Sequence, residues 1–240
     1  GRKAKLRNEQ DVFLVEGTKM YLEAPAERIR KVYLSQSLYE EKGESFVKGH
    51  DVEILEDRVF AAACDTKTPQ GVLCMVQQYH YRLEDLLKKK NPLLMILENL
   101  QDPGNLGTIL RTAEGVDGVI LSKESVDIYN PKTIRSTMGS VYRLPFLYVD
   151  SIESILPVLK KHHVHTYAAH LKGKNSYEQE NYCGGTAFFI GNEGNGLTDH
   201  LSSQADTLIR IPMEGKLESL NAAVASAILM YESYRQRRNA

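Results

Sequence analysis

Hydrophobic and polar positions alternate in short blocks along the chain. In its first third, short apolar runs with strand character are separated by segments with the spacing of amphipathic helices. The predicted strands are residues 12–15, 32–34, 52–55 and 71–76, and the predicted helices are residues 19–24, 38–47 and 58–63. Strand–helix alternation of this kind predicts a small sheet covered by helices.

A polar segment follows this block. Residues 79–91 end in Lys-Lys-Lys-Asn before Pro92, which predicts a linker or a connecting helix. The alternation then restarts, with predicted strands at 93–97, 118–121, 146–149, 166–169, 187–191 and 208–211 and predicted helices at 106–114, 152–161 and 220–236. The pattern therefore predicts two α/β domains, residues 1–78 and residues 92–240, joined by the linker 79–91.

Composition narrows the class of protein. The 240 residues are 42% hydrophobic and 25% charged, as in ordinary globular proteins. No apolar run approaches the roughly 20 residues that a membrane helix needs, and no signal segment is visible, so we expect no membrane partner. The three cysteines Cys64, Cys74 and Cys183 are far apart and form no CxxC pair, which disfavours zinc and a disulfide framework and favours the cytoplasm.

Charge gives no global sign of nucleic-acid binding, because the formal net charge is −1. Basic residues are nevertheless clustered, and RNA binding needs only one basic face. Solvated helix ends are the alternative explanation for each cluster. The clusters are Arg2, Lys3, Lys5 and Arg7; Arg28, Arg30 and Lys31; Lys88 to Lys90; and Arg235, Arg237 and Arg238.

Polar and glycine-rich segments follow three predicted strands. In the first, Pro103-Gly104 turns the chain and places Asn105 at the predicted N-cap of a helix that also carries Arg111. In the second, Gly191 and Gly196 enclose Glu193 directly after an apolar strand. Each segment alone could be a helix cap or a plain turn.

The third segment runs from Ile211-Pro212 to Ser219-Leu220-Asn221, at the start of the final helix, with Ser219 as the predicted N-cap. In an open α/β sheet, ligands bind beyond the carboxyl ends of the strands. Three such ends in one chain predict one composite site.

The three segments, in this order, resemble the three motifs of the SpoU-type RNA 2′-O-ribose methyltransferases of the SPOUT superfamily, over residues 92–238. Residues 11–77, with Phe13-Leu-Val-Glu16-Gly17, resemble the small ribosomal-protein-like RNA-binding domain that often precedes this enzyme domain. The resemblance implies an α/β fold with a mainly parallel sheet and a trefoil knot in the C-terminal domain. It also implies S-adenosylmethionine as methyl donor, an RNA substrate and a homodimer.

By motif position, the resemblance implies two groups of site residues. The cofactor-binding residues would be Gly191, Ile211 and Leu220, and the catalytic residues would be Asn105, Arg111, Glu193, Ser219 and Asn221. Methyl transfer to a hydroxyl needs positioning and help with the hydroxyl proton. The resemblance suggests Arg111 as the base, but a guanidinium stays protonated. Our hypothesis is that Arg111 binds a phosphate and stabilises the developing alkoxide, while the other polar residues orient the ribose.

Several alternatives remain open at this stage. Ribosomal RNA is the expected substrate and transfer RNA the next choice. A base methyltransferase, or an RNA-binding or assembly protein without turnover, would share much of the same pattern. Four histidines in one stretch could suggest a metal, but with no nearby carboxylate cluster we expect surface and strand-end histidines and no metal; they are His162, His163, His165 and His170.

Overall fold

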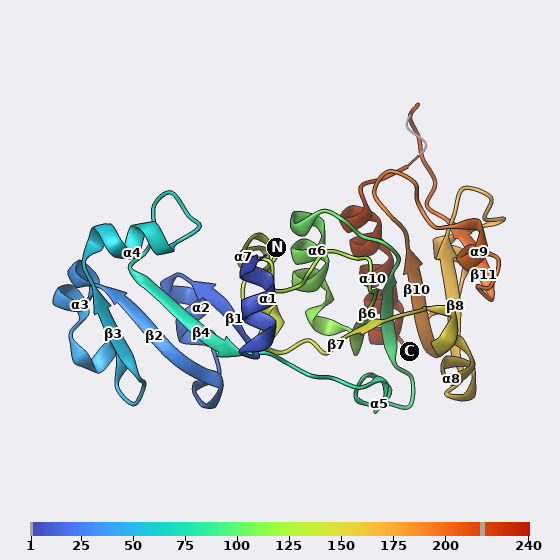
Figure 1. Cartoon of the computed structure of the whole chain (residues 1–240). Helices are drawn as coiled ribbons and strands as arrows, with labels where there is room; N and C mark the ends of the chain where they lie inside the picture. Colours follow the sequence, from blue (N-terminus) through green and yellow to red (C-terminus); the bar gives the residue numbers. More distant parts are fainter. Residues whose placement is uncertain (1, 217–218) are drawn as a thin grey trace. The chain divides into compact units, whose positions relative to one another are not determined.

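The computed structural model describes residues 2–216 and 219–240 (Figure 1). The chain divides into two compact units, Gly1–Tyr79 with Ile128–Tyr142, and His80–Asp127 with Arg143–Ala240. The segment 128–142 thus groups with the first unit, although it lies within the predicted second domain. The boundaries 1–78, 79–91 and 92–240 stay a prediction.

The first unit is built on a four-stranded sheet in the order β1-β4-β2-β3 (Figure 1). β4 pairs antiparallel with β1 and β2, and β2 pairs parallel with β3. Alternate residues such as Phe13, Val15, Val32 and Leu34 are fully buried on one face. The strands are β1 (Val12–Glu16), β2 (Ile29–Ser35), β3 (Val52–Leu55) and β4 (Val72–Gln77).

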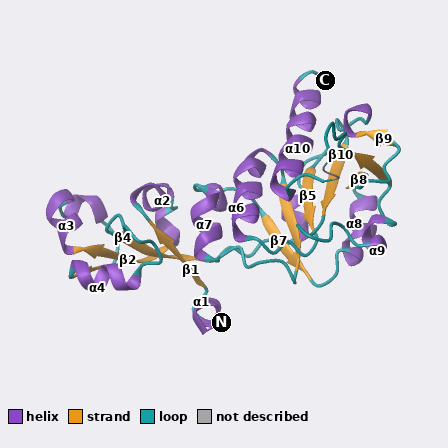
Figure 2. Cartoon of the chain, turned by 90° about the horizontal axis from the view of Figure 1, so that it is seen from above, coloured by secondary structure: helices purple, strands orange, loops and turns teal. Residues whose placement is uncertain are grey.

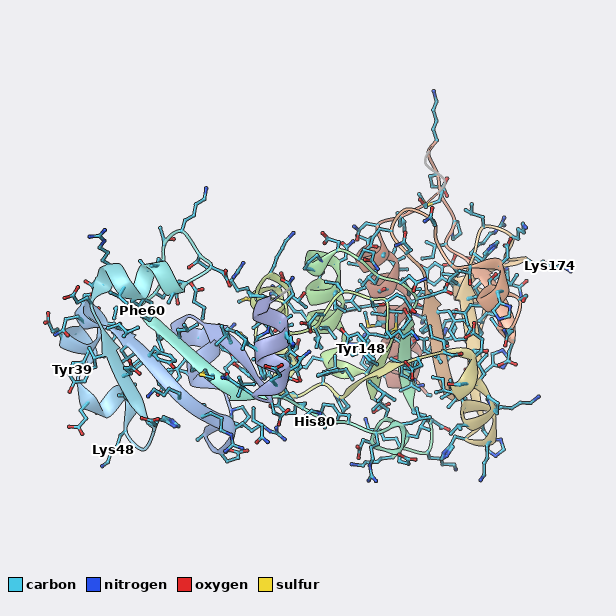
Figure 3. All side chains as sticks on the ribbon, in the orientation of Figure 1. Tyr39, Lys48, Phe60, His80, Tyr148 and Lys174 are labelled. Atoms are coloured by element: carbon cyan, nitrogen blue, oxygen red, sulfur yellow. The ribbon has the colours of Figure 1, made fainter. Side chains whose placement is uncertain are left out.

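Five helices belong to this unit, among the residues that the structure describes: α1 (Arg2–Glu9), α2 (Thr18–Glu23), α3 (Gln36–Lys42), α4 (Asp57–Ala63) and α7 (Pro131–Thr137). Phe60, labelled in Figure 3, comes from α4 and is buried. The predicted helix 38–47 is wrong in its second half, because Gly43 ends α3 at a φ of 72° and a 3-10 turn follows.

Aromatic contacts hold the segment 128–142 in the first unit. The Tyr129 ring stacks on Phe13 with 4.7 Å between ring centroids, and its hydroxyl oxygen accepts a 2.8 Å hydrogen bond from the Tyr79 backbone N–H. The Tyr142 hydroxyl donates to the Met20 carbonyl oxygen at 2.8 Å. These contacts explain why a segment between two strands of the second unit packs with the first.

The second unit has a seven-stranded sheet in the order β7-β6-β5-β10-β8-β11-β9, and all its strand pairs are parallel. This confirms the predicted α/β fold with a mainly parallel sheet. Every residue of β5 and β10 is buried, as expected for strands covered on both faces. The strands are β5 (Leu93–Leu97), β6 (Gly118–Ser122), β7 (Phe146–Val149), β8 (Val164–Ala169), β9 (Asn175–Ser176), β10 (Gly185–Ile190) and β11 (Thr207–Arg210).

Helices cover this sheet. Figures 1 and 2 show α6 and α10 lying side by side, while α8 packs beside β8. A buried cluster that includes Leu94, Ile96, Phe189 and Leu201 fills one part of the core. The helices are α5 (Leu83–Leu86), α6 (Pro103–Thr112), α8 (Leu156–Lys161), α9 (Asp199–Ser202) and α10 (Ala222–Arg238).

Two segments of the second unit pass each other closely. The His170 backbone N–H donates to the Ile209 carbonyl oxygen at 2.8 Å. A Cβ on Gly173 would lie 2.4 Å from the Ile209 carbonyl carbon, so only glycine fits there. Such a passage is compatible with a knotted chain, and the trefoil knot stays a prediction.

Candidate active site

The carboxyl ends of β5 and β10 meet at one edge of the parallel sheet. Leu97 pairs with Ile190 in the register of these neighbouring strands, and the Glu98 N–H donates to the Ile190 carbonyl oxygen at 2.8 Å. The residues that follow these two strands therefore enter adjacent loops. The first and second sequence motifs lie in these two loops.

The loop after β5 leads directly into α6. Asp102 is the N-cap of this helix, since its side-chain oxygen accepts a 2.7 Å hydrogen bond from the Asn105 N–H, and Pro103 occupies the first helical position. The prediction that Asn105 caps this helix is therefore wrong. Asn105 lies in the first turn instead, where its side-chain amide is available for contacts with other loops.

Glu193, in the loop after β10, ties these two loops together. Its carboxylate accepts hydrogen bonds from the backbone N–H groups of Gln101 (3.0 Å) and Asp102 (2.8 Å) and from the Asn105 side-chain amide (3.3 Å). Burial by itself raises the pKa of this carboxyl, but the hydrogen bonds outweigh it, so the pKa lies below its usual value of 4.5. An ionised carboxylate with these donors is an anchor and a weak proton acceptor.

Asn221 connects the third motif to this network. Its side-chain amide donates to the Asn105 side-chain oxygen at 2.9 Å, and its own oxygen accepts from the Ala223 and Val224 N–H groups. Asn221 is thus the N-cap of α10, and the prediction that Ser219 has this role is wrong. The helix begins at Ala222, so Ser219 remains in the preceding loop, exposed.

A cavity of about 340 Å³ opens beside this network. It is lined by the three predicted cofactor residues Gly191, Ile211 and Leu220, together with Glu193 and Ser219. Further apolar lining comes from Leu171, Ile190, Leu197 and Met213. Its volume lies in the range of small-molecule sites, and its mainly apolar wall with a few polar groups is typical of a cofactor pocket.

Gly191 sets the shape of this cavity. A Cβ at this position would lie 2.1 Å from the Gly196 carbonyl carbon and from the Leu197 nitrogen, so the backbone there has no room for a side chain. The bridge between Asn192 and Gly196 closes the loop over Gly191. Close approach of backbone is the feature for which glycine is required.

Arg111 lies apart from these contacts. It is exposed in the last turn of α6, and its side chain makes no hydrogen bond or ion pair with any residue that the structure describes. The structure therefore brings together seven of the eight predicted site residues, but not Arg111. Five of the seven line the cavity. The other two are Asn105, which is hydrogen-bonded to Glu193, and Asn221, which is hydrogen-bonded to Asn105.

Three residues that hold the loops in place, Asn99, Asn192 and Glu98, were not among the predicted site residues. The Asn192 side-chain amide donates to the Asn99 carbonyl oxygen at 2.8 Å, and Asn99 adopts a φ of 53° to reach this geometry. Glu98, which is buried, contacts Thr198 in the other loop. A carboxylate directly after a wholly apolar strand is the signal that could have identified Glu98.

No helix within residues 2–216 and 219–240 is long and apolar enough to cross a membrane. In the same described residues, no group of three or more His, Cys, Asp or Glu side chains is placed to hold a metal ion.

Known proteins share both parts of this architecture. The model of the SpoU rRNA Methylase family matches residues 92–231, and that of the MRM3-like substrate binding domain matches residues 2–74. The 23S rRNA (guanosine(2553)-2′-O)-methyltransferase RlmP of Bacillus subtilis is 34% identical over 180 residues, which are 74% of this chain and 70% of that protein.

Solved structures agree over nearly the whole length. The AdoMet-bound rRNA methyltransferase of Sinorhizobium meliloti has 30% identity and a TM-score of 0.85, covering 97% of this chain and 90% of that one. An RNA 2′-O ribose methyltransferase has 28% identity and a TM-score of 0.82, covering 98% and 92%. The resemblance predicted from the three motifs is confirmed, and the chain belongs to the SpoU rRNA methylase family.

Proposed function

We propose that this protein transfers a methyl group from S-adenosylmethionine to a ribose 2′-hydroxyl of ribosomal RNA. The observation that carries the proposal is the convergence of Gly191, Ile211, Leu220, Glu193 and Ser219 on one cavity at the strand ends. The Sinorhizobium meliloti relative, which holds AdoMet, shares the fold over almost all of this chain. The names of the Bacillus subtilis relative and of the second structural relative support the ribose 2′-oxygen as acceptor.

The cavity fits the cofactor in size and chemistry. Gly191, Ile211 and Leu220 would hold it, and Gly191 leaves its backbone open to close approach. When bound, the sulfonium supplies an electrophilic methyl group. The apolar side chains around the cavity would limit the access of water to this methyl group.

The polar residues divide the remaining tasks. Glu193, Asn105 and Asn221 form one connected chain of hydrogen bonds that fixes the loops around the acceptor, so their role is positioning. Ser219, which is exposed and lines the cavity, would contact the ribose. Arg111 has a free guanidinium within the described part of the chain, which suits an incoming phosphate and, next to it, the developing alkoxide.

A homodimer remains part of the proposal. On α10, Val224 is 49% exposed and Tyr231 is 62% exposed. They lie about two turns apart and therefore on the same side of the helix. Such an apolar surface on a helix next to the site is suited to a second copy of the chain. The first unit would bind the RNA, because it matches the model of the MRM3-like substrate binding domain. The three free cysteines favour the cytoplasm.

The test is transfer of labelled methyl from S-adenosylmethionine to unmodified ribosomal and transfer RNA in separate reactions, followed by nucleoside analysis. We expect label in a 2′-O-methylribose nucleoside of ribosomal RNA. Arg111→Ala should lose it, whereas Arg238→Ala should keep it, because Arg238 is also an exposed arginine in the last turn of a helix.

Other outcomes would change the assignment. Label on a base would contradict ribose methylation, and label only in transfer RNA would contradict the ribosomal substrate. Cofactor binding by calorimetry without label in either RNA would favour an RNA-binding protein that retains the fold.

A further inference from the structure

We propose that Glu98 is a positioning residue that sets the glycine loop, residues 191–198, and through it the cavity and Glu193. Glu98 is 8% exposed and directly follows β5. It does not line the cavity, and none of the three sequence motifs includes it. The part of this inference that concerns cofactor affinity rests on the proposed function.

Both oxygens of the Glu98 carboxylate are occupied by one residue. The Thr198 N–H donates to Oε2 at 2.8 Å, and the Thr198 hydroxyl donates to Oε1 at 2.7 Å. The same hydroxyl oxygen accepts from the Leu201 N–H at 3.1 Å and begins α9. Burying a carboxylate is costly unless strong hydrogen bonds compensate, and hydrogen bonds to a charged acceptor are among the strongest.

Glu98 and Glu193 act in opposite directions between the same two loops. Glu98 extends from the end of β5 to Thr198 at the far end of the glycine loop. Glu193 extends from the glycine loop back to Gln101 and Asp102, just beyond Glu98. Because each loop contributes a carboxylate that is hydrogen-bonded to the other loop, neither loop can shift without breaking these hydrogen bonds.

The glycine loop also forms a wall of the cavity, through Gly191, Gly196 and Leu197 among others. Release of Thr198 would free the end of this loop next to Leu197. Glu193 would then lose its fixed position, and with it the contact to Asn105. The Glu98 side chain thus acts on the cavity through Thr198, although Glu98 itself does not line the cavity.

The chain contains a matched control for this arrangement. Asp206 Oδ2 accepts from both the N–H (2.9 Å) and the hydroxyl (2.8 Å) of Thr166. Asp206 precedes β11, so it lies at the amino end of a strand, whereas Glu98 lies at the carboxyl end. Removing either carboxylate deletes the same type of contact, but only one of them lies at the site edge of the sheet.

The experiment compares Glu98→Ala with Asp206→Ala in the full chain, first without ligand. Amide hydrogen exchange at Gln101 and Asp102, whose N–H groups bind Glu193, should accelerate about tenfold or more in Glu98→Ala and stay unchanged in Asp206→Ala. A purely local structural role of Glu98 would change exchange at Thr198 and leave Gln101 and Asp102 as in the wild type, which would overturn the proposal.

The second measurement is the Kd of S-adenosylmethionine by calorimetry. We expect about a tenfold increase for Glu98→Ala, no change for Asp206→Ala, and partial rescue by Glu98→Gln, whose amide can accept from the Thr198 N–H and donate to its hydroxyl oxygen. Equal affinities of Glu98→Ala and the wild type would overturn the inference. If the wild type binds no S-adenosylmethionine, the proposed function fails, while the exchange data still decide the role of Glu98.

If Glu98→Ala does not fold, Thr198→Val serves as the second variant. It removes the hydroxyl that donates to Glu98, together with the cap that the same hydroxyl gives α9, and keeps the size of the side chain. Faster exchange at Gln101 and Asp102 in this variant supports the proposal, and unchanged exchange overturns it.

Discussion

The side-chain amide of Asn221 donates a 2.9 Å hydrogen bond to the side-chain oxygen of Asn105, across 116 residues of sequence. Asn221 caps α10, and Asn105 also donates to Glu193, so this one bond joins the third motif to the other two. The orientation of both amides is determined by their other partners, because Asn221 presents its oxygen to backbone N–H groups and Asn105 presents its nitrogen to a carboxylate.

The two roles of Asn221 can be separated by substitution. Asn221→Asp keeps an oxygen for the cap of α10 but has no donor for Asn105, so methyl transfer should fall by about 100-fold through misplacement of the site. Stability should change by only about 0.5 kcal/mol, because the cap remains. Steady-state methylation and urea unfolding measure the two effects.

Asn221→Ala is the comparison for this variant. It removes both the cap and the contact to Asn105, so it should cost about 1 kcal/mol of stability in addition to activity. An Asn221→Asp protein with wild-type activity would show that the bond to Asn105 is dispensable.

The contacts of Glu193 predict a loss of cofactor affinity in acid. Its pKa in the folded protein lies below the usual 4.5, because the hydrogen bonds to its carboxylate outweigh the opposing effect of burial. The stabilisation that the ionised Glu193 carboxylate gives the folded loops is therefore complete above pH 4.5. It is lost as the pH falls through the lower pKa of the folded protein. Calorimetric affinity for S-adenosylmethionine should decline over that interval.

Glu193→Gln should bind the cofactor weakly at every pH, since the uncharged amide also replaces one acceptor oxygen by a donor. Its affinity should show a flatter acid limb than that of the wild type. Parallel pH profiles of the two proteins would assign the acid effect to another group.

Gly191→Ala tests the backbone contact inside the cavity wall. The added Cβ would meet the backbone of Gly196 and Leu197 at 2.1 Å, so the glycine loop must move. We expect loss of measurable cofactor binding and a destabilisation of about 1 to 3 kcal/mol, as for overpacking. Thermal denaturation with and without S-adenosylmethionine checks both.

Gly194→Ala is the control in the same loop. Its Cβ would come no nearer than 3.5 Å, to the Asn192 side-chain oxygen, which is ordinary contact. Similar loss of binding in both alanine variants would mean that loop flexibility, not the close approach at Gly191, is the cause.

Arg237 provides a prediction for stability alone. Its guanidinium donates to the carbonyl oxygens of Tyr182 (2.8 Å), Asn91 (2.8 Å) and Gly184 (2.7 Å), so it ties α10 to the segments before β5 and β10. Burial lowers the pKa of this arginine. The planar fork donates from three separate nitrogens to three carbonyls spread around it, whereas the donors of an ammonium all lie on one nitrogen and cannot span the same positions.

Arg237→Lys should therefore lower the free energy of unfolding by about 1 to 3 kcal/mol. The exposed neighbour Arg238 offers the matched substitution Arg238→Lys, which should have little effect. Urea unfolding of both variants decides, and equal midpoints would contradict the role of Arg237.

Among the residues that the structure describes, local sequence was sufficient for every strand except the two-residue β9, and it was sufficient for the family. The apolar runs of β5 and β10 are buried on both faces, and their short length, bounded by proline, glycine or polar residues, favours a strand over a helix. The motif residues were identified because glycines and polar side chains follow strand ends, a local property. Short elements such as α7 and α9 were missed, since their formation depends on packing and caps rather than on a periodic pattern.

The tertiary structure alone decided which side chains perform which contact. Asp102 and Asn221 took the capping positions that sequence reasoning gave to Asn105 and Ser219, because several residues near each helix start can cap and neighbouring loops select among them. Glu98 emerged only when the register of β5 and β10 placed it beside the glycine loop. The sequence thus determined the fold class and predicted a candidate site at the strand ends. The network inside it depended on contacts between residues about a hundred positions apart, which no local pattern encodes.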